Sequence, residues 1–258
     1  MRTIALITDF GLRDPYVGAL KGVILSINPE ARIVDISHEI IAFHPISAAY
    51  VLAGVMNYFP RETIFLTVVD PGVGTERKIL LISSEGKYYI GPDNGVFAPV
   101  YQYAEEYTVY EVTEPHFFLP EPSPTFEARD KMAPVAAWLS RGIPVERFGR
   151  RTEEYRKFKL PQPKIDGNRI RGIVIHQDRF GNLALNIRKE DIKDRKILFG
   201  SIKGVKISNF ASTFMDIPPN ELGFIINSFG YLEIAVRMGS AAQVLKAGIG
   251  EPVELFIT

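Results

Sequence analysis

The chain has 258 residues, of which 46% are hydrophobic and 23% are charged, a balance typical of a globular protein. Lysine plus arginine equals aspartate plus glutamate at 30 each, so no net charge favours binding to nucleic acid or anionic lipid. The absence of cysteine excludes disulfides, thiolate nucleophiles and cysteine-bound metals. The start does not resemble a signal peptide, and no run approaches the roughly 18 apolar residues of a membrane helix, so we expect a cytoplasmic protein.

The first half of the chain alternates short apolar runs with amphipathic segments. Strands are expected at residues 4–7, 33–36, 64–69, 79–82 and 88–90, the last two paired as a hairpin. Helices are expected at residues 14–28, beginning with an aspartate cap and a proline, at 45–59 and at 130–139. This alternation predicts a Rossmann-like α/β domain with a mainly parallel sheet.

Residues 142–167 differ in composition, because three prolines lie among dense charges without a clear period. We expect a linker there, between an α/β domain at residues 1–160 and a second domain at 168–258, although a single meandering loop is an alternative. Beyond it, short apolar runs separated by turn residues occur at 170–176, 183–187, 205–208, 224–227, 231–236 and 253–257. Such a pattern predicts a smaller antiparallel β-barrel or sandwich.

Two aspartates follow predicted strands of the first domain. Asp9 comes after the first strand and Asp70 after the strand at residues 64–69. In a parallel α/β sheet, ligands bind beyond the carboxyl ends of the strands. Aspartate also favours the start of turns, so position alone leaves a structural cap and a ligand-binding role equally open.

Several common sites are disfavoured. The glycines of Gly72-Val73-Gly74 lack a following Gly-Lys-Ser/Thr, and no GxGxxG opens a helix, so a tight turn explains them better than a phosphate loop. The spacing of His38, His44, His116 and His176 matches no zinc motif, and we expect no metal. No GxSxG is present, which argues against a nucleophile-elbow hydrolase.

Six short polar motifs follow one another along the chain. They are Thr8-Asp9-Phe10-Gly11, Asp35-Ile36-Ser37-His38, Val69-Asp70-Pro71-Gly72-Val73-Gly74, Pro92-Asp93-Asn94-Gly95, Asp178-Arg179-Phe180-Gly181-Asn182 and Asn227-Ser228-Phe229-Gly230-Tyr231. Singly, they are explained as turns. Together and in this order, they resemble the S-adenosylmethionine (SAM) hydroxide adenosyltransferase family, the hydrolytic relatives of fluorinase and chlorinase.

The resemblance implies that the chain hydrolyses SAM to adenosine and methionine. Water or hydroxide would attack the ribose C5′ and displace methionine, with SAM as the substrate and no cofactor. Members of the family assemble as homotrimers, so the resemblance also implies sites between the amino-terminal domain of one subunit and the carboxyl-terminal domain of its neighbour.

The resemblance further implies a set of substrate-binding residues. Asp9 would hold the ribose 2′- and 3′-hydroxyls, because an ionised carboxylate offers two acceptor oxygens, and Phe43 would pack against the ribose or the reacting carbon. The residues expected at the amino-acid end of the methionine are Asp14, Asp178 and Ser228. Those expected at the adenine are Asn182, whose amide would read the base edge, and Phe214, which would stack on the ring.

The reactive residues of the family are an aspartate, an arginine and a histidine around the attacking water. Asp70 and Arg77 match the first two, and Glu127 stands where the family usually has histidine. Asp70 is expected to be the base, positioned by Arg77. Glu127 would orient the same water or pair with Arg77, which predicts a slowed enzyme rather than an inactive one.

Three other functions stay open. A halide transferase is disfavoured, because Asp70 would repel an anion and Ala128 stands where fluorinase has serine. A protein that binds adenosine or SAM without turnover is an alternative, and the glutamate at position 127 favours it. A structural protein that keeps only the trimer is the third.

Overall fold

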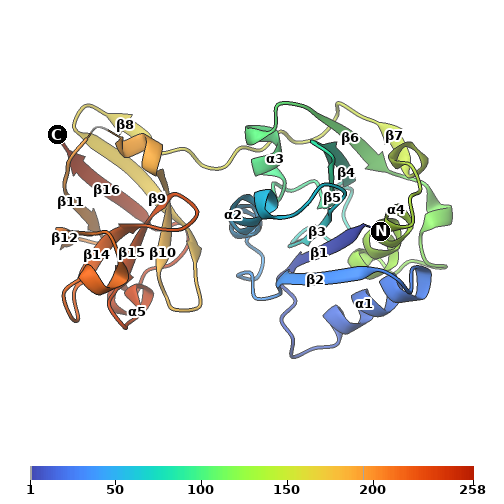
Figure 1. The fold of residues 1–258 in the computed structure, drawn as a ribbon, viewed down its shortest axis with the longest axis horizontal. Coiled ribbons are helices and arrows are strands. Elements are labelled where there is room, and N and C mark those ends of the chain that lie inside the picture. Colours follow the sequence, from blue (N-terminus) through green and yellow to red (C-terminus); the bar gives the residue numbers. More distant parts are fainter. Residues whose placement is uncertain (1, 194) are drawn as a thin grey trace. The chain divides into compact units, whose positions relative to one another are not determined.

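The computed structural model describes residues 2–193 and 195–258. The chain divides into two compact units, Met1–Lys159 and Leu160–Thr258. Figure 1 shows that the first unit, coloured blue to green, is a sheet with helices on both faces. The second unit, coloured yellow to red, is a curled sheet. Each unit is described separately below.

The amino-terminal unit is built on a mixed sheet in the order β2-β1-β3-β5-β4-β6-β7. The strands are β1 (Thr3–Thr8), β2 (Arg32–Ser37), β3 (Ile64–Val68), β4 (Ile79–Ser84), β5 (Lys87–Pro92), β6 (Tyr107–Val112) and β7 (Gly149–Arg151). Pairing is parallel from β2 to β5, whereas β4, β6 and β7 add in antiparallel fashion. The predicted α/β class and the β4–β5 hairpin are confirmed.

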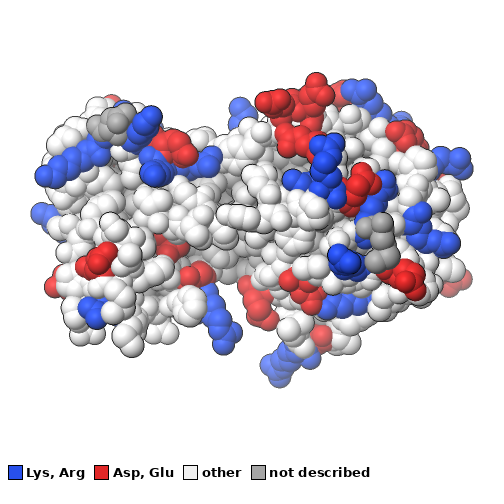
Figure 2. Space-filling view, in the orientation of Figure 1, with Lys and Arg blue, Asp and Glu red and all other residues white. Residues whose placement is uncertain are grey.

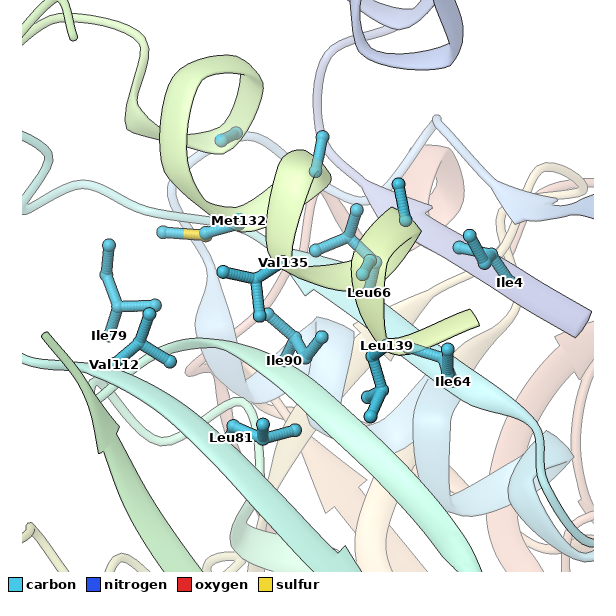
Figure 3. Packing of buried hydrophobic residues seen from close by; sticks show 14 of the residues in the cluster. Ile4, Ile64, Leu66, Ile79, Leu81, Ile90, Val112, Met132, Val135 and Leu139 are labelled. Atoms are coloured by element: carbon cyan, nitrogen blue, oxygen red, sulfur yellow. The ribbon is translucent and has the colours of Figure 1, made fainter. Parts of the chain in front are cut away.

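Helices cover both faces of this sheet, because the central strands are apolar on both sides. The helices are α1 (Tyr16–Ile27), α2 (Pro45–Val55), α3 (Ala98–Tyr103) and α4 (Ala133–Ser140). Alternate residues of β1 enter different cores: Ile4 and Leu6 join the cluster under α1 and α4, and Ala5 and Ile7 join the one under α2 and α3. Figure 3 shows Val135 of α4 lying over the sheet in the first cluster.

Two predicted helix starts differ from the structure. Pro15 takes the N-cap position of α1, and Asp14 makes no side-chain cap. The helix expected at 130–139 opens instead with a π-helical turn, Ala128–Met132, in which the Ala133 N–H donates to the Ala128 carbonyl. Such turns insert an extra residue and often occur at functional sites. Here the turn directly follows Glu127.

The carboxyl-terminal unit is a nearly closed, mainly antiparallel barrel, as predicted. Its strands are β8 (Lys164–Asp166), β9 (Arg169–Gln177), β10 (Leu183–Arg188), β11 (Ile197–Ile202), β12 (Val205–Ile207), β13 (Asn209–Ala211), β14 (Leu222–Ile226), β15 (Tyr231–Val236) and β16 (Pro252–Ile257). The order is β12-β11-β16-β9-β10-β15-β14-β13, and contact between β12 and β14 brings the two ends of the sheet together. Buried aliphatic side chains fill the interior, and the short helix α5 (Ala241–Leu245) packs against it.

The stretch without strands or helices is shorter than the expected linker. Within residues 142–167, β7 pairs with β6 of the first unit and β8 pairs with β9 of the second. Only residues 152–163 lie between these strands. Strands of three residues are too short for an alternating pattern to be visible in the sequence.

The surface is mixed in charge. On the face drawn in Figure 2, lysine and arginine side chains lie among aspartates and glutamates. Among the described residues, no helix combines the length and apolar character needed to cross a bilayer.

Candidate active site

The two strand-end aspartates lie at the same edge of the amino-terminal sheet. Thr8 of β1 pairs in parallel with Val68 of β3, so Asp9 and Asp70 leave neighbouring strands within a residue of each other. Burial raises the pKa of Asp9 despite a hydrogen bond from the Phe43 N–H, and the negative charge of Asp70 raises it further. Both carboxylates therefore lie at the edge of the sheet where α/β proteins bind ligands.

Arg77 forms a forked ion pair with Asp70. Its Nε donates to Oδ2 at 2.9 Å, its Nη2 donates to the same oxygen at 2.6 Å, and Nε also contacts Oδ1 at 3.1 Å. The side chains are only 7% and 5% exposed, so the pair is poorly hydrated. The Gly72 N–H donates to Oδ1 as well. Both carboxylate oxygens are thus fixed in direction, which suits a group that orients a small nucleophile.

Glu127 shares the same guanidinium. Arg77 Nη2 donates to Glu127 Oε2, and Lys131 Nζ donates to Oε1 at 2.5 Å. Burial alone would raise the pKa of Glu127, but Lys131 and Arg77 outweigh burial and hold it below its ordinary value. The three predicted reactive residues therefore lie together. Lys131 was not predicted, although a glutamate and a lysine four residues apart in a helical segment are a recognisable signal.

Two loops are held against each other to build this cluster. Gly74 has φ +81°, and a Cβ there would lie 2.8 Å from the Pro124 carbonyl oxygen, so the glycine lets the loop after Asp70 approach the one before Glu127. The rings of Phe10, Tyr16 and Phe126 pack together, with centroids 5.4–6.0 Å apart. These contacts join the segments that follow β1 and precede the π-helical turn.

The predicted residues of the carboxyl-terminal unit occupy turns. Asp178 accepts hydrogen bonds from the Asn182 backbone N–H at 2.8 Å and from Asn182 Nδ2 at 2.9 Å, which closes the β9–β10 hairpin. Ser228 is exposed in the β14–β15 turn. Phe214 is half-exposed at the start of a 3₁₀ turn. Asp178 and Asn182 thus lie together, and one amide hydrogen of Asn182 is already used within the hairpin.

Comparison with protein families identifies the family to which the chain belongs. Residues 4–149 match the SAM hydroxide adenosyltransferase N-terminal domain, and residues 172–254 match the C-terminal domain of the same family. The chain belongs to the SAM hydroxide adenosyltransferase family. The relation suggested by the six motifs is confirmed.

Relatives of this chain are similar over nearly their whole length. An (R)-S-adenosyl-L-methionine hydrolase of Methanocaldococcus jannaschii is 36% identical, with 98% of this chain and 95% of the relative covered. A fluorinase of Nocardia brasiliensis is 28% identical, with 98% and 96% covered. The crystal structure of an uncharacterized conserved protein from Thermotoga maritima superposes with a TM-score of 0.88 at 36% identity, covering 99% of this chain and 100% of that one.

The second motif of the chain, Asp35-Ile36-Ser37-His38, supports the Asp9 loop. His38 is buried; its Nδ1 lies 2.8 Å from Thr8 Oγ1 and its Nε2 lies 3.0 Å from Asp35 Oδ1. The His38 carbonyl also accepts the Gly11 N–H at 2.7 Å. These contacts tie both sides of Asp9 to the end of β2.

The fourth motif fixes the end of β3. Asn94 Nδ2 donates to the Val69 carbonyl at 2.8 Å, immediately before Asp70. The neighbouring Asp93 is buried and accepts the Arg156 N–H with both carboxylate oxygens at 3.1 Å. The sequence marks this motif without a role for it. The structure shows that it holds the strand from which Asp70 emerges.

Phe43 and Asp14 remain open to solvent. The Phe43 ring is 72% exposed, its φ is +66°, and its N–H donates to Asp9 Oδ2 at 3.0 Å. A non-glycine residue held in this region of φ costs roughly 1–3 kcal/mol, and such strain is concentrated at ligand-binding sites. Asp14 is exposed in the loop between β1 and α1. Both side chains are therefore accessible to a ligand.

The barrel contains a buried carboxylate, Glu233, that was not predicted from the sequence. Strand register aligns His176, Ala184 and Glu233 across β9, β10 and β15. Glu233 accepts a hydrogen bond from Asn227 Nδ2 at 3.0 Å, and its pKa is raised by burial and by the charge of Asp178. Burial lowers the pKa of His176 to about 4, which keeps this imidazole neutral. Alternation of apolar residues in these strands gives no sign of titratable groups there.

Within residues 2–193 and 195–258, no three His, Asp or Glu side chains are grouped as metal ligands. The two buried carboxylates of the candidate site, Asp70 and Glu127, contact Arg77.

Proposed function

We propose that this chain hydrolyses (R)-S-adenosyl-L-methionine to adenosine and L-methionine. The observation that carries the proposal is the buried Asp70–Arg77–Glu127 cluster beside Asp9, at the edge of the sheet where α/β proteins bind ligands. Asp9 would bind the ribose diol, which would place C5′ near Asp70. The relatives named as hydrolases support the choice of reaction.

The reaction requires mainly that the protein align the attacking water with C5′ of the substrate. A water oxygen forms a bond to C5′ while the C5′–S bond breaks, and the electron pair of that bond returns to sulfur as a neutral thioether. The sulfonium is already an activated leaving group, so the protein mainly positions water and excludes competing solvent. Asp70, held by Arg77, would accept a hydrogen bond from the water and then its proton. The proton is released to solvent after adenosine forms.

The carboxylate at position 70 fits a cationic substrate better than a halide. Position 70 holds a carboxylate rather than a neutral residue that would admit an anion beside C5′. Relatives matched above 30% identity are named hydrolases. Hydrolysis therefore stands ahead of halide transfer, despite the 28% identity to a fluorinase.

Incubation with purified (R)- and (S)-SAM, followed by chromatography of the products, tests the proposal. Adenosine and methionine in equal amounts, above the spontaneous background, are expected. Parallel incubations contain chloride or fluoride. Binding of adenosine in calorimetry without adenosine release from SAM would identify a binding protein, and a 5′-halo-5′-deoxyadenosine product would identify a halide transferase; either result contradicts the proposal.

We also propose that the working form is a homotrimer with shared sites. The residues expected to bind ribose and water, Asp9 and Asp70, belong to one unit, and those expected at adenine and methionine, Asp178 and Asn182, belong to the other. A complete site thus draws on both units. The resemblance to the family favours two different subunits as their source.

Complementation of two inactive variants tests this assembly. Asp70→Ala impairs only the first unit and Asp178→Ala only the second, so each pure variant is expected to be nearly inactive at low SAM concentration. If sites are shared between subunits, random co-assembly restores roughly one intact site in four, and activity should approach that fraction of wild type. Activity equal to the sum of the separate variants, or a monomeric mass in light scattering, would contradict shared sites.

A further inference from the structure

The formal charges of the buried cluster sum to zero only when Lys131 is included. Asp70 and Glu127 bring two negative charges, and Arg77 brings one positive charge. Lys131 supplies the second positive charge from one turn further along the helical segment, with its side chain 27% exposed and that of Glu127 8% exposed. Taking an unbalanced carboxylate out of water is unfavourable, so Asp70, Arg77 and Glu127 without Lys131 would form a costly cluster.

We propose that Lys131 is a positioning residue of this active site, which keeps Glu127 ionised and leaves the guanidinium of Arg77 oriented on Asp70. The proposal rests on the function proposed above. It also accounts for glutamate at a position where the family usually has histidine. A neutral imidazole would leave Asp70 and Arg77 balanced by themselves, whereas Glu127 with Lys131 reaches the same net charge with one more ion pair.

The two cations contact different carboxylate oxygens of Glu127. Lys131 Nζ contacts Oε1, and Arg77 Nη2 contacts Oε2. Arg77 Nε stays with Asp70 at 2.9 Å. Without the lysine, Glu127 would either take up a proton or draw Arg77 away from Asp70. Either change loosens the carboxylate that orients the water, and a small misplacement of such a group slows catalysis strongly.

Steady-state adenosine release by Lys131→Met, Lys131→Arg and wild type tests the role. We expect Lys131→Met to lower kcat roughly 10-fold with little change in KM, since Lys131 contacts Glu127 rather than the substrate. Lys131→Arg should recover most of the loss. The matched control is Lys203→Met, which removes a partly exposed lysine from its ion pair with Glu251 in the other unit and should leave kcat unchanged.

The pH profile separates positioning from a general loss of structure. The charged groups that face Glu127 are Arg77 from the β3–β4 connection and Lys131 from its own helical segment. Removing Lys131 removes a cation that favours the ionised form, so the acid limb of the kcat profile should move to higher pH. In a Glu127→His background no carboxylate needs the lysine, and Lys131→Met should then change kcat less than twofold.

A carboxyl titration tests the inference without any substrate. The ¹³C resonance of Glu127, assigned by its loss in Glu127→Gln, should titrate at higher pH in Lys131→Met than in wild type, and near the wild-type value in Lys131→Arg. If wild type releases no adenosine, the proposed hydrolysis fails while this measurement still decides the role of Lys131. An unchanged Glu127 titration, or a kcat loss from Lys131→Met that is equal in the wild-type and Glu127→His backgrounds, would overturn the inference.

Discussion

Replacing Asp70 with alanine is expected to lower kcat about 10²–10⁴-fold, the usual contribution of a general base. The variant would lack the group proposed to orient and deprotonate water, and Arg77 would lose its forked partner. The dissociation constant for adenosine, measured by calorimetry, should stay within about twofold of wild type, because Asp70 contacts water rather than ribose in the proposed complex.

Two controls accompany the Asp70 experiment. Asp191→Ala removes a hydrogen-bonded aspartate from the other unit, where it accepts the Arg188 N–H at 2.7 Å, and should leave kcat unchanged. Thermal unfolding of both variants tests whether the fold survives. A loss of adenosine affinity as large as the loss of kcat would show that Asp70 binds the nucleoside, and the assignment as a base would be wrong.

Replacing Asp9 with alanine is expected to weaken adenosine binding roughly 100-fold, because two hydrogen bonds to a charged group are lost at about 1.5–3 kcal/mol each, partly offset by water. The same carboxylate accepts the N–H of Phe43, so its loss also frees the backbone beneath the exposed ring. Calorimetric titration with adenosine measures the effect.

Asp14→Ala provides the matched comparison for Asp9. Asp14 is expected at the amino-acid end of SAM, so its loss should leave adenosine affinity unchanged and weaken only SAM. In wild type, adenosine affinity should fall as the pH decreases through the pKa of Asp9, at a higher pH than for an ordinary aspartate because burial raises that pKa. Adenosine affinity that does not respond to Asp9→Ala would exclude the diol contact.

The buried strands of the amino-terminal unit could be predicted because each is a continuous apolar run. Residues 64–68, three of which are β-branched, are buried throughout β3, and such a run is the signal that parallel strands leave in a sequence. By contrast, β6 is not among the predicted strands, because it lacks a continuous apolar run, although its tyrosines, threonine and valines are typical of strands. The three-residue strands β7 and β13 are defined by tertiary pairing rather than by local composition.

The site could be predicted in part for similar reasons. Asp9 and Asp70 follow recognisable strands, and their meeting at one edge is a rule of the fold. The contact of Arg77 with Glu127 joins residues 50 positions apart, and only the resemblance to the family suggested it. Lys131 lies four residues after Glu127 and Asn94 belongs to the fourth motif, but the local sequence does not show which groups these two side chains contact.

The charge balance between the carboxylates of Asp70 and Glu127 and the cations of Arg77 and Lys131 constrains which substitutions this cluster can accept during evolution. Losing the charge at any one of the four positions would leave an unpaired charge in a poorly hydrated cluster, and we expect the intermediate protein to be less stable and slower. Drift at these positions should therefore proceed by reciprocal exchange, with a glutamate and a lysine gained or lost together. Homologues that carry only one of the pair would be the ones to examine for impaired turnover.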